Sequence, residues 1–157
     1  AFNQQAWLLQ PLTEDRAALD RALAALPGLM AEGTRLDLGL QAGAAALAEV
    51  EAPRVKAMVF LTDGLPNRVP TPVAGGTQED TVLAAAAAAR AAGILIQAVG
   101  YGREDAPELV DRILPWLLRA IAGPGGGYRE TDDAGQLAET FRVLAAELGC
   151  VRQPAWP

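Results

Sequence analysis

The sequence contains no histidine and no serine, and its single cysteine, Cys150, lies close to the end of the chain. These absences exclude a Ser-His-Asp triad and a Cys-His pair. They also exclude the His and Cys ligand sets that bind zinc. One cysteine cannot form an intramolecular disulfide, so the cysteine content indicates no redox compartment. Any chemistry in this chain must therefore depend on other side chains.

Basic residues are few and scattered, with one lysine, Lys56, and a formal net charge of −6. Nucleic-acid binding needs a stripe of positive charge that displaces counterions from phosphates, and the sequence shows none. Long apolar runs are also missing, because Arg90, Gly93 and Gln97 interrupt the longest one, 82–99. The opening residues do not match a signal peptide. We therefore expect no nucleic-acid partner and no membrane segment in this chain.

The composition that remains is that of one globular domain. Of the 157 residues, 51% are hydrophobic, which is enough to form a core. Alanine supplies much of this fraction, and alanine favours helix. We expect one domain over 1–150 and a tail over 151–157. Because the chain opens at Ala1-Phe2-Asn3 and not at Met, we interpret it as a fragment or a processed product.

Apolar periodicity predicts strands that alternate with helices. Val55–Leu61 and Ile94–Val99 are continuous apolar runs, typical of strands that are covered on both faces of a parallel sheet. A long loop, Thr62–Gly76, and an alanine-rich helix, Glu79–Ala92, lie between them. This alternation predicts an α/β fold, namely a Rossmann-like, doubly wound and mostly parallel sheet with helices on both faces.

The other elements are predicted from spacing and from helix-capping and turn residues. Residues 6–12 are expected to form a short edge strand or an arm, and 51–54 a polar break. Tyr128–Glu130 is expected to be a short strand. Asp105 is expected to cap a helix that runs to about Ala122, kinked or split by Pro115. Further helices are predicted from Glu14 to Leu26 with a leucine stripe (Leu19, Leu23, Leu26), from Gly33-Thr34 with Gly43 as a close-packing point, and from Asp132 or Asp133 to Leu148.

Asp63 and Thr34 are the candidate site residues. In an open parallel sheet, ligands bind beyond the carboxyl ends of the strands, where Asp63 follows Leu61. The Thr34 hydroxyl supplies a second hard oxygen, and Mg²⁺ prefers oxygen ligands. Each residue also has a purely structural interpretation. Thr34 with Asp37 matches a helix capping box, and Asp63-Gly64 matches a turn.

The motifs taken in order resemble a von Willebrand factor type A domain over nearly the whole chain. They are Gly33-Thr34, the strand that ends in Leu61-Thr62-Asp63-Gly64, the strand Ile94–Gly100, Gly126-Gly127-Tyr128 and the closing helix. The resemblance implies that Thr34 and Asp63 are two parts of a metal-ion-dependent adhesion site (MIDAS) for Mg²⁺, or for Mn²⁺ or Ca²⁺. The loop from Leu65 to Gly76 would flank the site, and the expected partner-binding residues are Gly64, Leu65, Asn67 and Arg68.

The resemblance also implies what this chain lacks. The first family motif, Asp-x-Ser-x-Ser, cannot occur in a chain without serine. In family terms residues 6–12 correspond to the antiparallel third strand, and the first strand beside Val55–Leu61 is missing. That strand would then expose a long apolar edge, which proteins avoid. We therefore expect an upstream segment or a second chain to complete the sheet, and this chain alone to bind Mg²⁺ weakly or not at all.

The function implied by the resemblance is a non-enzymatic module that binds a protein partner through the partner's Asp or Glu side chain. An extracytoplasmic or cell-surface place and a bacterial source are expected with it. Two alternatives stay open. One is a Rossmann-like hydrolase or phosphoryl-transfer enzyme that uses Asp63. The other is a structural module of a larger ATPase or chelatase-type assembly.

Overall fold

The structure of the protein is a computed structural model, which describes residues 1–29, 31–50, 55–71, 76–107 and 112–150. It forms a three-stranded parallel sheet in the order β1-β2-β3, built from β1 (Lys56–Thr62), β2 (Ile94–Tyr101) and β3 (Gly127–Thr131). The predicted α/β class and parallel sheet are confirmed. The expected polar break at 51–54 and the tail 151–157 lie outside the described residues.

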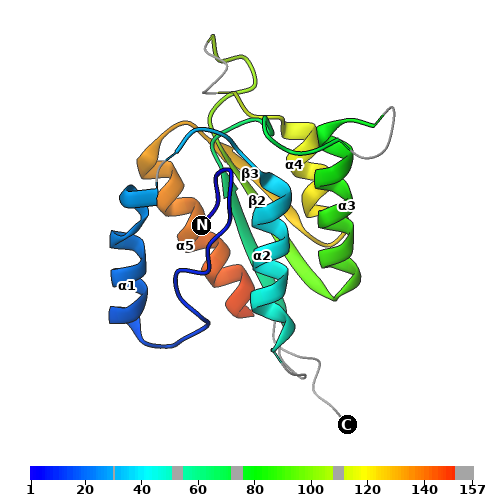
Figure 1. Cartoon of the computed structure of the whole chain (residues 1–157). Helices are drawn as coiled ribbons and strands as arrows, with labels where there is room; N and C mark the ends of the chain where they lie inside the picture. Colours follow the sequence, from blue (N-terminus) through cyan, green and yellow to red (C-terminus); the bar gives the residue numbers. More distant parts are fainter. Residues whose placement is uncertain (30, 51–54, 72–75, 108–111, 151–157) are drawn as a thin grey trace.

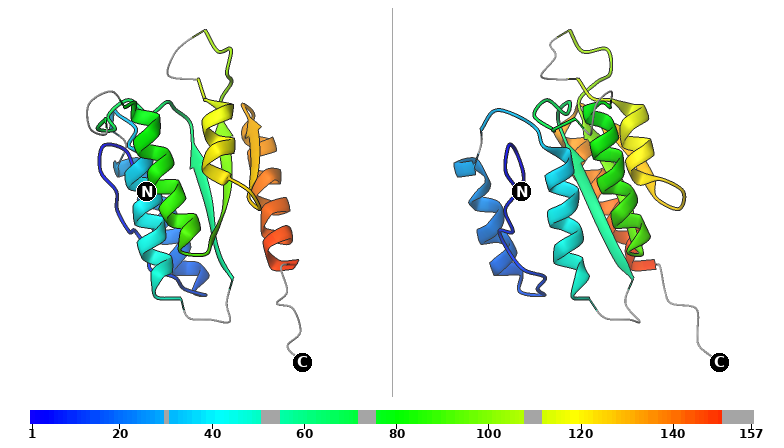
Figure 2. Two further views of the ribbon diagram at one scale, coloured as in Figure 1. Left: turned by 90° about the vertical axis from the view of Figure 1, so that its right-hand side faces the viewer. Right: turned by 45° about the vertical axis from the view of Figure 1, so that its right-hand side comes forward.

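Helices cover the two faces of the sheet unequally. One layer consists of α2 (Leu36–Ala48), α3 (Gln78–Ala91) and α4 (Pro115–Ala122), which pack against one another and against the sheet. The helix α5 (Ala134–Cys150) lies on the opposite side and contacts β3 (Figures 1 and 2). The main core therefore lies between the sheet and the three-helix layer. Its fully buried members include Leu40, Ile96, Leu117 and Ile121.

Small residues set the spacing in this core. A Cβ on Gly43 of α2 would lie 2.7 Å from the Met58 methyl carbon of β1, so the helix approaches the strand closely only with glycine there. The close-packing role predicted for Gly43 is confirmed. Gly39, one turn earlier, leaves the space that the ring of Phe2 occupies. The burial of β1 alternates, with Met58, Phe60 and Thr62 buried and the residues between them half-buried. The apolar run predicted a strand covered on both faces, and in the described residues one face of β1 is covered only in part.

The N-terminal region differs from the sequence prediction. Residues 6–12 form no strand; they belong to an arm, residues 1–12, whose only bridge within the described chain joins Phe2 to Ala6. Of the two predictions for residues 6–12, the arm is confirmed and the short edge strand is wrong. The arm runs between α1 (Arg16–Ala24) and α2 (Figure 1). Pro11 has no backbone N–H to donate to a ladder, and the polar Gln10 beside it interrupts the apolar run.

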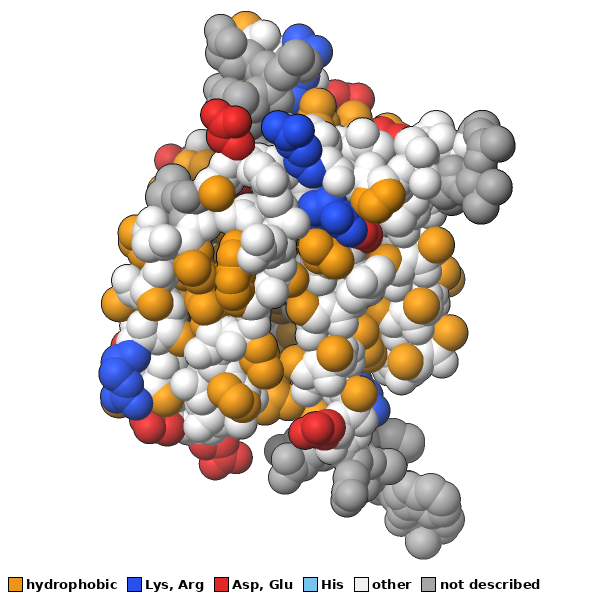
Figure 3. Space-filling view, in the orientation of Figure 1, with side chains coloured by type: hydrophobic (Ala, Val, Ile, Leu, Met, Phe, Trp, Pro, Cys, Tyr) orange, Lys and Arg blue, Asp and Glu red, His pale blue; other side chains and the backbone are white. Residues whose placement is uncertain are grey.

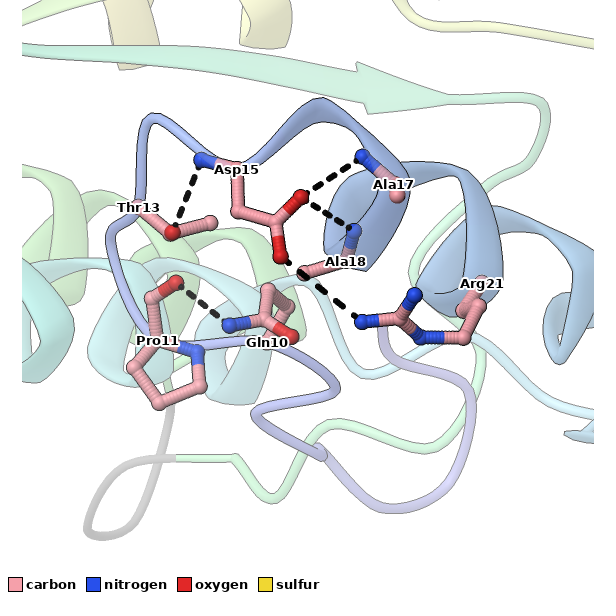
Figure 4. Close-up of polar contacts among 7 residues, drawn as sticks. All are labelled: Gln10, Pro11, Thr13, Asp15, Ala17, Ala18 and Arg21. Carbon is pink, nitrogen blue, oxygen red and sulfur yellow. Dashed lines mark hydrogen bonds and ion pairs between the residues drawn. The ribbon is translucent and has the colours of Figure 1, made fainter.

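The first helix begins at Arg16, close to the predicted start at Glu14, with Asp15 as its capping residue. The Asp15 carboxylate accepts hydrogen bonds from the backbone N–H groups of Ala17 and Ala18, at 2.9 and 3.2 Å (Figure 4). The helix ends at Ala24, close to the predicted end at Leu26, and a short 3₁₀ turn, η1 (Leu26–Leu29), follows it. The leucine stripe of α1 is not buried, because the helix packs mainly on η1: Leu19, Leu23 and Leu26 are 42%, 62% and 38% exposed.

The helix predicted from Asp105 begins only at Pro115. Leu114 has extended backbone angles, as the residue before a proline prefers, and Pro115 occupies the first turn, where its missing N–H costs nothing. Asp105 does not cap a helix; its carboxylate accepts two hydrogen bonds from Arg103 instead. At the other predicted cap, Asp133 accepts a hydrogen bond from the Gln136 N–H at 2.7 Å and opens α5.

Arg90 of α3 forms hydrogen bonds with the end of α4. Its guanidinium donates to the carbonyl oxygens of Ala120 and Ile121, at 3.1 and 2.6 Å, which belong to the last turn of α4. The last carbonyls of a helix have no partner inside the helix, so this contact satisfies groups that water would otherwise solvate. Gly123, with a φ of +65°, ends α4 directly against the Arg90 side chain.

We predict that Arg90→Met lowers the free energy of unfolding by about 2 kcal/mol, because it removes two hydrogen bonds from a charged donor and keeps the aliphatic stem. Urea unfolding followed by circular dichroism measures the change. The matched control is Arg103→Met, which breaks an ion pair whose side chains are 60% and 74% exposed and should leave stability nearly unchanged. Equal effects in the two variants would contradict this role of Arg90.

Candidate functional site

The end of β1 presents Asp63 to solvent. Thr62, the last residue of the strand, is 4% exposed, and its hydroxyl both accepts from the Gly64 N–H and donates to the Gly64 carbonyl oxygen, each at 3.3 Å. These contacts close a tight turn over a buried threonine. Asp63, between the two residues, is exposed at the carboxyl edge of the sheet. The chain thus carries a carboxylate at the place where parallel sheets bind ligands.

Thr34 lies in the segment that leads into α2, and it does not cap the helix. The capping position belongs to Arg35, without a side-chain capping bond, so the predicted Thr34–Asp37 capping box is wrong. The reason is that Asp37 has a different partner. Its carboxylate accepts from the Arg35 Nε and Nη2 atoms at 2.8 and 2.6 Å. The Thr34 hydroxyl makes no hydrogen bond among the described residues.

The Arg35–Asp37 pair is a buried anchor beneath the site segment. Asp37 is 2% exposed, in the first turn of α2, where the helix dipole also favours a negative charge. The hydrogen bond to Asp37 raises the pKa of Arg35 above its usual value. A buried carboxylate needs such a partner, because its desolvation is otherwise costly. The pair therefore fixes the backbone direction immediately after Thr34.

Asn67 links Thr34 to the loop that follows Asp63. Its side-chain oxygen accepts a hydrogen bond from the Thr34 backbone N–H at 2.8 Å, and its own backbone N–H donates to the Thr34 carbonyl oxygen at 3.4 Å. Both backbone groups of Thr34 are thus bonded to one residue of the loop that follows Asp63. This contact holds Thr34 against the Asp63-Gly64 turn, although 33 positions separate Thr34 from Asn67 in the sequence.

Close packing around the two glycines supports the same arrangement. A Cβ built on Gly64 would lie 3.3 Å from the Thr34 hydroxyl oxygen, so this hydroxyl lies directly beside the turn after Asp63. Gly33 has a φ of +94°, which favours glycine. A Cβ there would lie 2.7 Å from the Gln4 side chain and 2.8 Å from that of Arg68. The segment that carries Thr34 is therefore enclosed by the arm on one side and by the loop on the other.

The loop that flanks the site is anchored at its described end. Val69 is 3% exposed and belongs to the core, and the Thr81 hydroxyl of α3 donates to the Pro70 carbonyl oxygen at 2.7 Å. Asn67 and Arg68 are exposed next to this anchor, whereas Leu65 is half-buried. Residues 72–75 of the loop lie outside the described residues. Of the predicted partner-binding residues, Asn67 and Arg68 thus lie on the surface at the site.

The donor set suits a hard divalent cation in part. Thr34 and Asp63 would supply one neutral hydroxyl and one carboxylate, which are the oxygen ligands that Mg²⁺ prefers. Among the described residues no group of three or more His, Cys, Asp or Glu side chains lies together in a way that could hold a metal. Mg²⁺ takes six ligands, so the other positions must be filled by water or by groups outside these residues.

The role of Asn67 was not visible in the sequence. The prediction placed it at the site as a partner contact, and nothing in the structure tests that role. Asparagine in loops often bonds to nearby backbone groups, which is the one signal that the sequence offers. The partner of this bond is distant in the sequence, so only the folded chain identifies Thr34. The same is true of the contact between the Asn3 carbonyl oxygen and the Arg35 N–H, at 2.8 Å.

No described helix is both long and apolar enough to cross a membrane. No curated protein matches the chain. Solved structures match its fold. The pilus adhesin SpaC from Lactobacillus rhamnosus GG aligns with 85% of this chain at 18% identity and a TM-score of 0.65. Proximal thread matrix protein 1 from the mussel byssus, solved with a zinc-occupied MIDAS motif, aligns with 95% at 20% identity and a TM-score of 0.62.

This chain corresponds to only part of those proteins, covering 21% of the adhesin and 35% of the byssus protein. At these identities the likeness establishes the fold and nothing finer. The family comparison goes further, because the model of the von Willebrand factor type A domain matches residues 1–140. That span includes the three strands, Thr34, Asp63 and the first part of α5. The chain therefore belongs to the von Willebrand factor type A domain family.

Proposed function

We propose that this chain is a non-enzymatic protein-binding module in which Thr34 and Asp63 hold a divalent cation that engages an acidic group of a partner. The observation that carries the proposal is the double contact of Asn67 with Thr34, which brings the two oxygen donors to one edge of the sheet. Membership of the family supports a metal-dependent module of this kind. Mg²⁺ is the proposed ion, because the two donors are hard oxygens.

The charge of the site explains why the partner would be acidic. Asp63 is the one carboxylate in the proposed donor set, so a bound divalent cation would keep a net positive charge. Two protein donors also leave coordination positions that water would occupy. A carboxylate from a partner can replace such a water and neutralise the remaining charge. Arg68, exposed beside Asn67, would add an attractive charge for the same carboxylate.

The two donors alone do not complete the coordination shell of the proposed cation. We propose that an upstream segment or a second chain supplies the missing ligands and pairs with the open edge of β1. We also propose an extracytoplasmic or cell-surface setting. The similar folds of a pilus adhesin and of a byssus protein support this setting. In this arrangement the chain's own residues orient two ligands, and the partner's carboxylate completes the coordination.

We predict that Mn²⁺, added below stoichiometric amounts, broadens the amide NMR signals of Thr34, Asp63 and Gly64 before other signals. Asp63→Asn should remove this selective broadening, because it removes the charged ligand while keeping the shape of the side chain. Asp105→Asn is the matched control, since Asp105 is also exposed in a loop at the carboxyl end of a strand. Broadening that persists in Asp63→Asn, or that disappears in Asp105→Asn, would contradict the site.

The carboxylate preference has its own test. Acetate, used as a probe for the partner's side chain, should displace water from bound Mn²⁺ and lower the relaxation enhancement of the water protons. Acetamide has nearly the same shape and no charge, so it should have little effect. Equal effects of acetate and acetamide, measured on protein that shows the selective broadening, would contradict an acidic partner and leave the metal site itself intact.

We predict that calorimetric titration of the chain with Mg²⁺ gives weak binding or none. Two protein ligands leave most of the coordination shell to water, which Mg²⁺ gives up reluctantly and which adds little affinity. The variant for comparison is Asp63→Ala. Micromolar binding in the chain that is lost in Asp63→Ala would show that the described donors complete a tight site without any further segment.

We predict that Asn67→Ala speeds amide hydrogen exchange at Thr34 by roughly two- to tenfold, which corresponds to the loss of one ordinary hydrogen bond. Asn67→Asp keeps an oxygen acceptor and should keep most of the protection. NMR-detected exchange in metal-free protein measures both variants. The selective Mn²⁺ broadening at Thr34 should weaken in Asn67→Ala only. Unchanged exchange in Asn67→Ala would show that Asn67 does not hold Thr34 in place.

A further inference from the structure

The outer edge of β3 is unpaired among the described residues. The strand order β1-β2-β3 places β2 on one side of β3 and no described strand on the other. This edge lies across the sheet from β1, whose own open side borders a hollow surrounded by hydrophobic side chains (Figure 3). The upstream segment or second chain proposed above would pair with β1, so it would leave the β3 edge open.

The outward backbone groups of β3 belong to Tyr128 and Glu130. The Thr131 carbonyl oxygen accepts from the Gly102 N–H at 2.9 Å, so Thr131 turns its backbone groups towards β2. In a parallel pair both backbone groups of one residue point to the same side, and successive residues alternate. Arg129 therefore also faces β2, whereas Tyr128 and Glu130 face outwards. No turn, loop or capping bond among the described residues uses their four backbone groups.

The face of β3 beneath α4 carries an unpaired cation and an unused acceptor. Arg119 of α4 holds its guanidinium carbon 4.9 Å from the centre of the Tyr128 ring, an attractive cation–π geometry. This guanidinium joins no ion pair with the described residues. The Tyr128 hydroxyl donates to Oε2 of Glu130, and the other carboxylate oxygen, Oε1, accepts no hydrogen bond from them. The two unused groups have opposite charge.

Trp116 is exposed on the same side of α4. It lies three residues before Arg119, which places both side chains on one face of the helix. Its neighbours Leu117 and Leu118 are buried in the core, whereas Trp116 is 50% exposed. Tryptophan and arginine are the residues most enriched at the centres of protein interfaces. The composition of this face is therefore that of an interaction surface.

We propose that a second copy of this chain pairs with β3, strand against strand and antiparallel, about a two-fold axis at Arg129. In this register Tyr128 lies opposite Glu130 of the second copy, and their outward backbone groups form a hydrogen-bonded pair on each side of the axis. Glu130 of the second copy then lies beside Arg119, so its unused Oε1 meets the unpaired guanidinium. Moving the axis by one residue would place two Glu130 or two Tyr128 side chains opposite each other.

The other features of β3 fit the same axis. On the face beneath α5 the two Arg129 side chains would lie opposite each other, and like charges oppose pairing. Each is neutralised by Glu147 of its own chain, at 2.7 Å. On the opposite face α4 packs on β2 and β3, so the two copies of α4 would flank the axis and cover Trp116. The surface is thus complementary to itself, which selects a second copy as the occupant.

This inference goes beyond the proposed function and does not depend on it. The pairing uses β3 and α4, whereas the proposed metal site lies past the end of β1, at the other side of the sheet. Because the two copies are antiparallel, their Asp63 side chains would lie at opposite ends of the joined sheet. A dimer that binds no metal would support this inference alone, and a monomer that binds metal would support the proposed function alone.

Sedimentation velocity over a wide range of protein concentration tests the proposal. We expect a monomer–dimer equilibrium in the wild-type chain. Glu130→Arg places two guanidinium groups together on each side of the axis and should weaken the dimer by roughly tenfold or more. The double variant Arg119→Glu/Glu130→Arg reverses both charges and should recover most of the affinity. Glu14→Arg is the matched control, because it makes the same charge change at an exposed residue before α1.

Hydrogen exchange of the wild-type chain provides a readout that needs no variant. The outward amides of Tyr128 and Glu130 should gain roughly tenfold protection as the protein concentration rises, while the amides of α1 should not. The proposal is overturned by a monomer at every concentration, by a dimer that a folded Glu130→Arg variant retains in full, or by a folded double variant that regains no affinity. A dimer that Glu14→Arg abolishes also overturns it.

Circular dichroism establishes whether each variant is folded. If Glu130→Arg does not fold, the exchange measurement on the wild-type chain decides the question. Protection of the Tyr128 and Glu130 amides that does not change with protein concentration then overturns the proposal, and protection that rises with concentration at these two amides supports it.

Discussion

The parallel pairing of β1 with β2 is the interaction on which the candidate site depends. Seven residue pairs run in register, from Lys56 opposite Ile94 to Thr62 opposite Gly100. Parallel strands end at the same edge, so the register places the Thr62–Gly64 turn next to the exit of the central strand. The buried Thr62 hydroxyl then closes the turn, and Asp63 is left in solvent. A shift of the strand register by one residue would turn the Asp63 side chain towards the core and the Thr62 side chain towards solvent.

The unequal covering of the sheet is the second constraint. The layer of α2, α3 and α4 buries Met58 and Phe60 on one face, whereas the described helix on the other face, α5, packs mainly on β3. The half-buried residues of β1 and its unpaired edge both follow from this arrangement. Leu19 and Leu23 of α1 are also exposed to solvent.

Sequence patterns predicted the regular elements well, because each depends on local signals. Continuous apolar runs identified β1 and β2, and capping residues located the starts of α1 and α5. The errors arise where another residue or contact overrides the local signal. Pro115 delays α4 by some ten residues relative to the predicted Asp105 cap, since its ring suits a first turn. Asp37 pairs with Arg35 and leaves Thr34 without the predicted capping role.

The sequence supplied the residues of the candidate site but not their geometry. Thr34 and Asp63 were selected by motif, and the motifs also led to the family, which the match over residues 1–140 shows. The contact that brings them together comes from Asn67, whose side chain and backbone both bond to the backbone of Thr34, 33 positions back along the chain. Long-range bonds of this kind have no periodic signal in the sequence. The contacts of Asn67 determine where Thr34 lies, and they do not identify what Thr34 and Asp63 bind.

The arm connects the open edge with the candidate site. Phe2 stacks on Phe60 of β1, and one residue further along the Asn3 carbonyl oxygen accepts from the N–H of Arg35, next to Thr34. A strand that paired with β1 would have to displace Phe2, and the neighbouring bond to Arg35 would be strained or lost. Thr34 would then be held by Asn67 alone. The two bonds of Asn67 lie on the loop side of the segment and do not involve the arm. The geometry therefore lets the edge change its partner while Thr34 stays beside Gly64, with the Arg35–Asp37 pair as the fixed point beneath it.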